Sequence, residues 1–342
     1  MIHSSQQIEW SATAPLAEAF PEWPMGWYAI ARSRELAQQP ISMELFGRRL
    51  VCFRSSRGKP IAMDAQCWHM GADLSQGEVI DDQIACPFHG WRYATSGRCV
   101  HIPSQSEVPF CARQQIYAAD EVAGNVFVFP ATQSKFPVPF FAATDPAELV
   151  AAPPFEFIVN CPWYLVGANG FDLQHFAGPH NRRLSGHPVI ESVHSAARRI
   201  LATFEVCGEN WKDELTRRFA GRRVTMDVTV WSGTLAFVMA HFHDSAHWNG
   251  NASAATTFGM TEIRPFSCDP RKKSLVRITI FRKRRIGLGI LDQLDVRIRR
   301  YFIHAFLKPD TLLLNNALYD PERFINADRE MVAYFHWLAS AS

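Results

Sequence analysis

The chain has 342 residues, of which 47% are hydrophobic, 12% aromatic and 20% charged. This composition excludes a disordered or collagen-like chain, and the length predicts one large domain or two ordinary ones. Lys and Arg exceed Asp and Glu by 35 to 33, so no overall charge points to nucleic acid or to an anionic membrane. No apolar run approaches the roughly 18–20 residues of a membrane span, and the first ten residues lack a secretion signal. We therefore expect a soluble, cytoplasmic protein.

The N-terminal part of the sequence predicts an all-β domain. Between Trp27 and about Phe129, β-rich runs such as 50–53 and 125–129 alternate with Gly, Asp and Ser turn signals. Six prolines between residues 130 and 154 then exclude a continuous helix or a central strand. We predict a connector there. The predicted parts are an extension at 1–26, the all-β domain at 27–130, the connector at 131–154 and a second domain at 155–342.

The second domain combines predicted strands with helices at both ends. Runs rich in β-branched and aromatic residues predict strands at 224–231, 235–239 and 275–281. Helices are expected at about 163–177, 289–316 and 327–339. Strands bracketed by helices predict an α+β fold. The basic stretch 282–300 suggests either contact with a membrane surface or, as we favour, a helix that faces solvent or another subunit.

Eight cysteines in 342 residues are too few for a disulfide framework, so clustered ones are considered as metal ligands. Two short motifs each contain one Cys and one His, with sixteen residues between them: Cys67-x-His69 and Cys86-x-x-His89. A Cys₂His₂ zinc finger instead pairs Cys with Cys and His with His. Splitting the pairs lets each loop give a thiolate to one iron and an imidazole to the other, as in a Rieske [2Fe–2S] cluster. A structural zinc site is the alternative.

A second candidate metal site lies downstream, at Asp172, His175 and His180. On a helix, Asp172 and His175 would share a face, whereas His180 would lie about 140° around the helix from His175. Gly178 and Pro179 break such a helix just before His180, and can return its imidazole toward His175. Two imidazoles with open positions suit a non-haem Fe(II) site, which needs one further carboxylate.

The last predicted helix supplies candidates for that carboxylate. Asp328 lies in line with apolar positions 331, 332, 335 and 338, and a carboxylate on a buried stripe costs several kcal/mol unless it pairs or binds a metal. We therefore predict Asp328 as the third ligand, with Glu330 and Asp320 as alternatives. A rival pair, His241 and His243, lies on one face of a predicted strand and is interpreted as lining the substrate pocket or as packing.

The sequence resembles the Rieske non-haem iron oxygenases in two places. The first is residues 67–103, which contain the cluster motifs, although Trp68 and Met70 stand where the family often has Pro and Arg. The second is the segment from Asp172 to His180, whose spacing is similar to the family's iron-binding motif. Asp328 aligns with the late carboxylate of the family.

This resemblance implies a fold and an activity. The second domain would be an antiparallel sheet of the helix-grip type, whose strands between 224 and 243 form the pocket together with the region after His180. Trp231, Phe237 and Met239 are candidates for the pocket wall, with the core as the equal alternative. The protein would be an oxygenase, a monooxygenase rather than a dioxygenase, which uses O₂ at Fe(II) on a small apolar, aromatic or alicyclic substrate. It would form a homotrimer, in which His89 of one chain hydrogen-bonds to Asp172, the electron relay, of the next.

The electron donor must be a separate protein. The chain has no GxGxxG-type nucleotide fingerprint, so electrons from NAD(P)H would arrive through a reductase or a ferredoxin. The basic segment 48–59 is a candidate docking patch for an acidic carrier, and a solvated face is the simpler interpretation. The competing function is an electron-transfer Rieske protein without oxygenase activity, and the complete set of Asp172, His175 and His180 favours the oxygenase.

Overall fold

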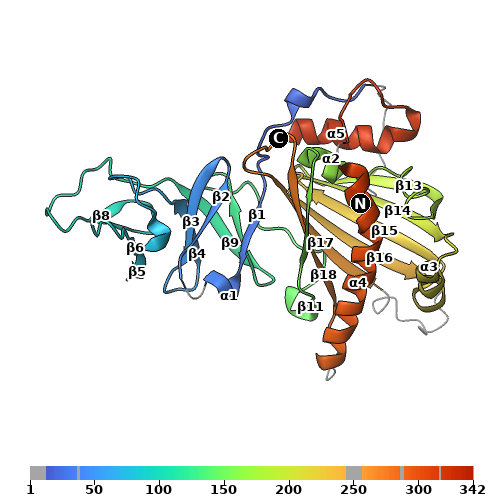
Figure 1. Cartoon of the computed structure of the whole chain (residues 1–342), viewed down its shortest axis with the longest axis horizontal. Coiled ribbons are helices and arrows are strands. Elements are labelled where there is room, and N and C mark those ends of the chain that lie inside the picture. The colour runs from blue at the N-terminus through green and yellow to red at the C-terminus, as the bar shows by residue number, and fades with distance from the viewer. Residues whose placement is uncertain (1–12, 37–38, 244–255, 286–288, 316, 342) are drawn as a thin grey trace, which may run out of the picture. The chain divides into compact units, whose positions relative to one another are not determined.

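The computed structural model describes residues 13–36, 39–243, 256–285, 289–315 and 317–341. The chain divides into two compact units (Figure 1): residues 25–140, and the N-terminal segment up to Pro24 together with residues 141–342. Of the predicted extension 1–26, residues 1–12 lie outside the described part. Its described residues pack on the C-terminal unit, where the ring of Phe20 stacks on Tyr164 with centroids 4.3 Å apart.

The regular elements of the unit 25–140 are almost all antiparallel strands, as the sequence predicts. A six-stranded sheet has the order β1-β10-β9-β4-β3-β2, and a four-stranded sheet has the order β5-β6-β7-β8. The strands are β1 (Tyr28–Arg32), β2 (Ile41–Leu45), β3 (Arg48–Arg54), β4 (Pro60–Asp64), β5 (Glu78–Ile80), β6 (Gln83–Ala85), β7 (Arg92–Tyr93), β8 (Cys99–His101), β9 (Ile116–Val122) and β10 (Asn125–Phe129), with a short helix α1 (Ser33–Leu36).

The core of this unit lies beneath two loops. Val51, Phe53 and Met63, from β3 and β4, pack in one buried cluster with Cys67 and Cys86, which belong to the loops after β4 and β6. All three core side chains are fully buried. The two loops that carry the predicted cluster motifs therefore rest on a rigid apolar base.

The C-terminal unit is an eight-stranded antiparallel sheet with helices. Its order is β11-β18-β17-β16-β15-β14-β13, and β12 also pairs with β18. The strands are β11 (Leu149–Ala151), β12 (Phe155–Val159), β13 (Arg182–His194), β14 (Ala197–Val206), β15 (Arg223–Trp231), β16 (Leu235–His243), β17 (Thr256–Pro265) and β18 (Ser274–Lys283); the helices are α2 (Trp163–Ala168), α3 (Trp211–Leu215), α4 (Gly289–Leu314) and α5 (Arg329–Ala341). The α+β fold class is confirmed. The short strand β11 lies within the range 131–154 predicted as the connector.

The helices differ from the predicted ones at one place that matters. The last two helices are close to the predicted bounds, but α2 ends at Ala168, and residues 169–180 form turns instead of continuing to 177. Two glycines, Gly167 and Gly170, weaken the helix there. Gly167 is also fitted against Tyr334, since a Cβ at this position would lie 2.3 Å from the Tyr334 hydroxyl.

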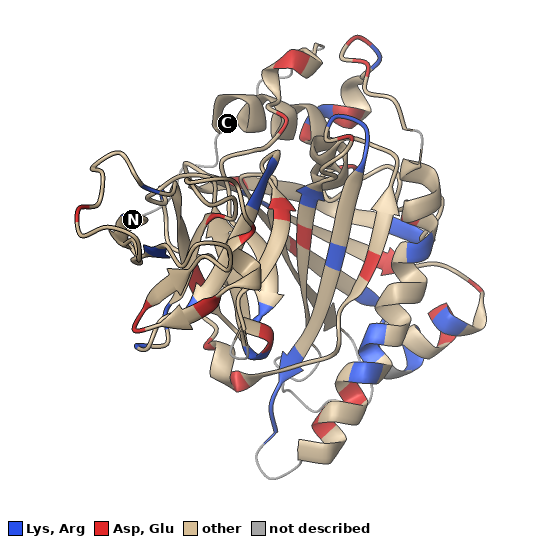
Figure 2. Ribbon diagram, turned by 60° about the vertical axis from the view of Figure 1, so that its left-hand side comes forward, with Lys and Arg blue, Asp and Glu red and all other residues tan. Residues whose placement is uncertain are grey.

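Charged residues are interspersed along the chain (Figure 2), in agreement with the formal net charge of +2. In the basic stretch 282–300, Arg282 pairs with Asp292 and Asp295, and Arg299 also pairs with Asp295. Within the described residues, none of the helices combines the length and the apolar character that crossing a bilayer requires.

One face of the C-terminal sheet forms a cavity. Val228, Val238, Gly259 and Ile280 are direct cross-strand neighbours on β15 to β18, so they share this face. Together with side chains of α4, which lies across the sheet (Figure 1), they line a cavity of about 540 Å³. The sheet therefore supplies an apolar wall opposite a helix whose lining side chains are also mostly apolar, with Asp310 and Thr311 as the polar ones.

Candidate metal centres

Two similar loops carry the Cys and His motifs of the N-terminal unit. In each loop the carbonyl of the cysteine accepts a hydrogen bond from a glycine four residues later: Gly71 N to Cys67 O at 2.8 Å, and Gly90 N to Cys86 O at 3.0 Å. Both glycines have positive φ, +75° and +68°, which L side chains rarely adopt. The glycines therefore close two tight turns, each with its histidine at the tip.

Burial separates the thiols from the imidazoles. Cys67 and Cys86 are 3% and 4% exposed, whereas His69 and His89 lie at the surface with ring centroids 4.7 Å apart. Burial raises the pKa of the Cys67 thiol, so a bound metal would be needed to hold it as a thiolate. Two inner sulfur ligands and two outer nitrogen ligands fit a cluster whose outer iron faces solvent.

Neighbouring aromatic side chains support this arrangement. The Tyr93 hydroxyl lies 3.0 Å from the Cys67 sulfur. The indole of Trp91 stacks on the His69 ring, with centroids 4.5 Å apart and planes 6° apart. These contacts orient a sulfur and an imidazole toward a common centre, as outer-shell partners do in metal sites.

The second site brings together His175, His180 and Asp310. One ligand atom from each of these residues lies within 4.8 Å of the other two, which is close enough for the three to hold one metal ion. The two histidines come from the turns after α2, and Asp310 comes from α4. His180 and Asp310 are buried, and all three side chains line the cavity.

The hydrogen bonds of these three residues leave one ring nitrogen of each histidine and one carboxylate oxygen of Asp310 available to a metal. His175 Nδ1 lies 2.5 Å from the carbonyl oxygen of Asp172, which can only accept, so Nδ1 carries the proton and Nε2 remains. His180 Nε2 and Asp310 Oδ1 are 2.7 Å apart, and both are buried without a hydrogen-bond partner among the described residues. Asn169 donates to the other carboxylate oxygen of Asp310 at 3.3 Å. The set fits a divalent metal with two imidazoles and one carboxylate.

Burial also sets the protonation of His175. Desolvation lowers the pKa of this imidazole, against the attraction of Asp310 and Asp172. The neutral ring is the form that binds a metal.

Asp172 lies beside the site. Its Oδ1 accepts from the backbone N–H of Gln174 at 3.1 Å and of His175 at 3.2 Å, which stabilises the turn. Its Oδ2 is 3.9 Å from His175 Nδ1. Asp172 thus contacts the candidate metal ligand His175 and is not itself one of the three candidate ligands.

Asp328, predicted as the third ligand, does not lie with the two histidines, and Asp310 occupies that place. Asp328 precedes α5, where its Oδ2 accepts from Ile325 N at 2.9 Å and its Oδ1 from Gln174 Nε2 at 2.6 Å. Asp328 is the last residue of the short 3-10 helix Asn326–Asp328, and α5 begins one residue later, so its carboxylate closes that turn and is not part of the buried stripe of α5. The alternatives are also paired elsewhere: Glu330 with Arg329 and Asp320 with Arg323.

The rival histidines and the predicted wall residues lie off the cavity. His241 contacts the Thr256 hydroxyl at 3.0 Å, and His243 the Thr225 hydroxyl at 2.9 Å. The cavity is lined by their neighbours on the same strand, such as Val238, Ala240 and Phe242. By the same alternation Trp231, Phe237 and Met239 face the other side of the sheet. The predicted strands are confirmed, and of the alternatives left open for these residues the structure favours packing over a place in the cavity wall.

A family model describes the first site. The Rieske [2Fe-2S] domain matches residues 26–117, a segment that contains both Cys and His motifs. The chain therefore carries a Rieske domain, which confirms the first of the two places of resemblance, residues 67–103.

Solved structures extend the likeness to the rest of the chain. A crystal structure of dicamba monooxygenase bound to dicamba covers 94% of this chain and 98% of that one, with a TM-score of 0.68 and 18% identity. A mutant of NdmA from Pseudomonas putida CBB5 with theobromine covers 92% and 89%, with a TM-score of 0.67 and 17% identity. Both units of the chain together thus have the fold of these oxygenases.

Curated relatives match over shorter segments. The oxygenase component of 3-ketosteroid-9-alpha-monooxygenase from Rhodococcus rhodochrous is 38% identical over 125 residues, 36% of this chain and 33% of that protein. Cholesterol 7-desaturase from Drosophila melanogaster is 34% identical over 175 residues, 49% of this chain and 40% of that protein. The chain thus matches between a third and two fifths of these relatives' lengths.

Proposed function

We propose that the chain is the oxygenase component of a Rieske-type system, which uses O₂ and two electrons from an NAD(P)H-linked reductase or ferredoxin to oxidise a small apolar substrate. Monooxygenation is favoured. The observation that carries this proposal is the His175, His180 and Asp310 set, which faces a cavity of about 540 Å³ in a chain with a Rieske domain. An electron carrier would need neither this set nor the cavity.

Each centre has its own ligands in this proposal. Cys67, His69, Cys86 and His89 hold the [2Fe–2S] cluster. His175, His180 and Asp310 hold Fe(II). When bound, the cluster supplies single electrons and the mononuclear iron supplies a redox centre with open coordination positions for O₂.

The protein's own residues prepare the second centre. The Asp172 carbonyl holds His175 in the tautomer that leaves Nε2 free, and Asn169 holds the Asp310 carboxylate. The apolar wall excludes water from the space beside these ligands. With iron held by the three ligands, the cavity would offer a substrate an apolar space beside the open coordination positions.

The lining of the cavity favours a fused alicyclic ring system as substrate. The sheet contributes mainly apolar side chains, among which Val and Ile are the most frequent, and α4 adds Phe302 and Phe306. Such walls bind by area and shape rather than by many hydrogen bonds. The printed names of two relatives, a 3-ketosteroid monooxygenase and a cholesterol desaturase, support substrates of this class.

Electron delivery to the iron involves a neighbouring chain in this proposal. A homotrimer would place the cluster of one chain next to the iron of another, with the exposed His89 facing Asp172. The position of Asp172, with Oδ2 3.9 Å from His175 Nδ1, supports its role as the relay.

The external electron donor has fewer free cations to bind than the sequence suggests. Three of the five basic residues in 48–59 form ion pairs: Arg48 with Asp64, Arg49 with Asp73, and Arg54 with Glu121. A docking role for this segment therefore rests mainly on Arg57 and Lys59, which are exposed.

The test uses the purified holoprotein with a surrogate reductase. We expect two cluster irons and one mononuclear iron per chain, and O₂ uptake coupled to oxidation of at least one compound in a panel of steroids and other alicyclic substrates. A protein that holds the cluster alone and consumes no O₂ beyond the reductase blank would be the electron carrier. A colourless zinc protein would contradict both functions.

A further inference from the structure

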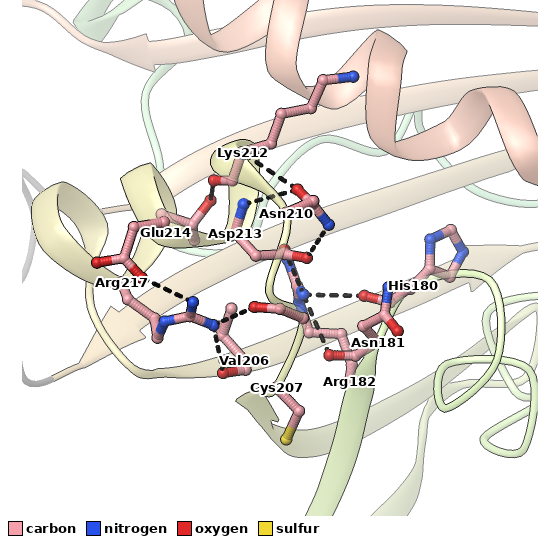
Figure 3. A network of polar contacts seen from close by, with 12 residues as sticks. His180, Asn181, Arg182, Val206, Cys207, Asn210, Lys212, Asp213, Glu214 and Arg217 are labelled. Carbon is pink, nitrogen blue, oxygen red and sulfur yellow. Dashed lines mark hydrogen bonds and ion pairs between the residues drawn. The ribbon is translucent and has the colours of Figure 1, made fainter.

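A buried ion pair lies directly behind His180. The Arg182 guanidinium and the Asp213 carboxylate are 2.7 Å apart, and each side chain is 8% exposed. Burying two charges costs several kcal/mol, so the pair is weak evidence for a role in stability alone. Figure 3 shows the Arg182 guanidinium between the Asp213 carboxylate and the backbone of His180 and Asn181.

Arg182 holds the backbone of the histidine. One guanidinium nitrogen, Nη1, donates to the His180 carbonyl at 2.8 Å and to Asp213 Oδ1 at 2.7 Å. The chain turns at Asn181, whose φ of +51° is in the left-handed region, so the Arg182 side chain can return to the residue two positions before it.

Arg182 also supports the ring of the histidine through a third residue. The Phe306 ring stacks on the His180 imidazole, with centroids 4.0 Å apart and planes 17° apart. The Arg182 guanidinium carbon lies 5.6 Å from the centre of the same Phe306 ring. The backbone and the ring plane of His180 therefore both depend on this arginine.

Asp213 is itself held in place. Asn210 caps α3 by accepting from the Lys212 and Asp213 N–H groups at 3.0 Å each, and its Nδ2 donates to Asp213 Oδ2 at 2.5 Å. A Cβ at Gly208 would lie 1.8 Å from Asp213 Oδ2, so only glycine fits beside this carboxylate. Both carboxylate oxygens thus have fixed partners, Arg182 and Asn210.

The same short helix forms part of the cavity wall. Trp211 and Lys212 line the cavity next to Asp213, and the Trp211 ring meets Phe302 of α4 with centroids 6.4 Å apart. A molecule in the cavity that shifts Trp211 or Lys212 also acts on Asp213, the next residue of α3, which holds Arg182. The cavity wall and the metal ligand are thereby connected through two side chains.

We propose that Arg182 and Asp213 are positioning residues that fix His180 as a ligand of the mononuclear metal and connect it to α3 in the wall of the cavity. This inference rests on the proposed function, because it needs a metal at His175, His180 and Asp310. A contact that only stabilises the fold would not change how tightly His180 binds the metal, whereas this ion pair should.

The experiment measures metal affinity rather than turnover. The full-length protein with its cluster intact is stripped of mononuclear iron and titrated with Fe(II), and separately with Co(II), whose visible spectrum reports ligand geometry. Asp213→Asn and Arg182→Met are expected to weaken Fe(II) binding by about 10- to 100-fold, the usual effect of losing an outer-shell partner of a metal ligand. Arg182→Lys keeps the charge and one donor, and is expected to restore part of the affinity.

The matched control is a second ion pair in the same sheet. Arg199 contacts Asp227 through two hydrogen bonds of 2.8 and 2.6 Å, and the Asp227 side chain is 3% exposed. Asp227→Asn should leave Fe(II) affinity and the Co(II) spectrum unchanged. An equal loss of affinity in this control would show a general structural effect and overturn the proposal.

A further variant keeps the test decisive if Asp213→Asn does not fold. Phe306→Leu removes the ring stack but leaves the ion pair, and is expected to change the Co(II) spectrum. Folded Arg182→Met and Phe306→Leu variants with the parent's affinity and spectrum would overturn the inference. If the parent protein binds no metal at this site, the proposed function fails instead.

Discussion

His180 and Asp310 place two buried atoms, Nε2 and Oδ1, 2.7 Å apart, and neither has a hydrogen-bond partner among the described residues. Buried polar atoms without a hydrogen bond cost about 1–3 kcal/mol each, so a metal ion that binds both atoms is expected. We predict that Asp310→Ala loses the mononuclear iron, with a drop in Fe(II) affinity beyond the about 100-fold typical of an outer-shell change. The measurement is iron per chain together with a Fe(II) titration.

Asp328→Ala is the matched control for that experiment. This substitution removes the hydrogen bond that closes the 3-10 turn before α5 and the contact with Gln174, so it is expected to lower stability by about 1 kcal/mol. The mononuclear iron should remain. Iron loss in Asp328→Ala with retention in Asp310→Ala would contradict the assignment and restore the ligand expected from the sequence.

The choice between Asp310 and Asp328 could not be made from the sequence alone. The criterion of a carboxylate on an apolar helical stripe fits a second helix besides the last one. On α4, Ile303, Leu307, Asp310 and Leu314 follow helical spacing and all line the cavity. The pattern for Asp310 was therefore present in the sequence. What the sequence lacked was the exact start of α5, which excludes Asp328 from the stripe.

The Cys-x-His and Cys-x-x-His motifs of the first metal centre were predictable because each is formed by residues close together in the sequence. Cys67 and His69 are two residues apart, and Gly71 closes their turn, so spacing alone describes the loop. The cavity wall is not local. Whether Phe237 or Val238 faces inward depends on which side α4 covers, and that is decided by packing far along the chain.

Asp172→Asn tests the relay. Asparagine keeps an oxygen that can accept from the Gln174 and His175 N–H groups, so the turn should persist while the negative charge is removed. We expect product formation to fall by about 10- to 100-fold, with both metal centres fully occupied. Single-turnover product yield and iron content are measured on the same sample. Normal yield with both centres intact would rule out the relay.

Gly259→Leu tests the cavity as the substrate site. A Cβ at Gly259 would make only ordinary contacts, the nearest at 3.7 Å to Ile280, so the larger side chain extends into the cavity from the centre of the wall. For a substrate found in the oxygen-uptake screen, KM should rise by about tenfold or more, because the filled space is no longer available. Iron content should not change.

The control for this substitution adds volume on the opposite face of the sheet. Met239 pairs with Phe258 across the strands and does not line the cavity. Met239→Phe should therefore leave KM at the parent value. If both variants raise KM equally, the effect comes from the sheet as a whole, and the cavity is not the substrate site.

His241 is expected to make stability depend on pH. Burial lowers its pKa below the ordinary 6.5, against the attraction of Asp227 and with help from His243 and Arg199. The folded protein therefore takes up its proton at lower pH than the unfolded chain, so stability should fall as pH drops below about 6.5. The His241→Gln variant has no imidazole to protonate, so it lacks this contribution to the loss of stability. Its unfolding temperature should therefore decline less than the parent's between about pH 7.5 and pH 5. Calorimetry of the variant, the parent and a His187→Gln control at an exposed position measures the difference. Parallel curves for all three proteins would show that His241 does not titrate differently in the folded state.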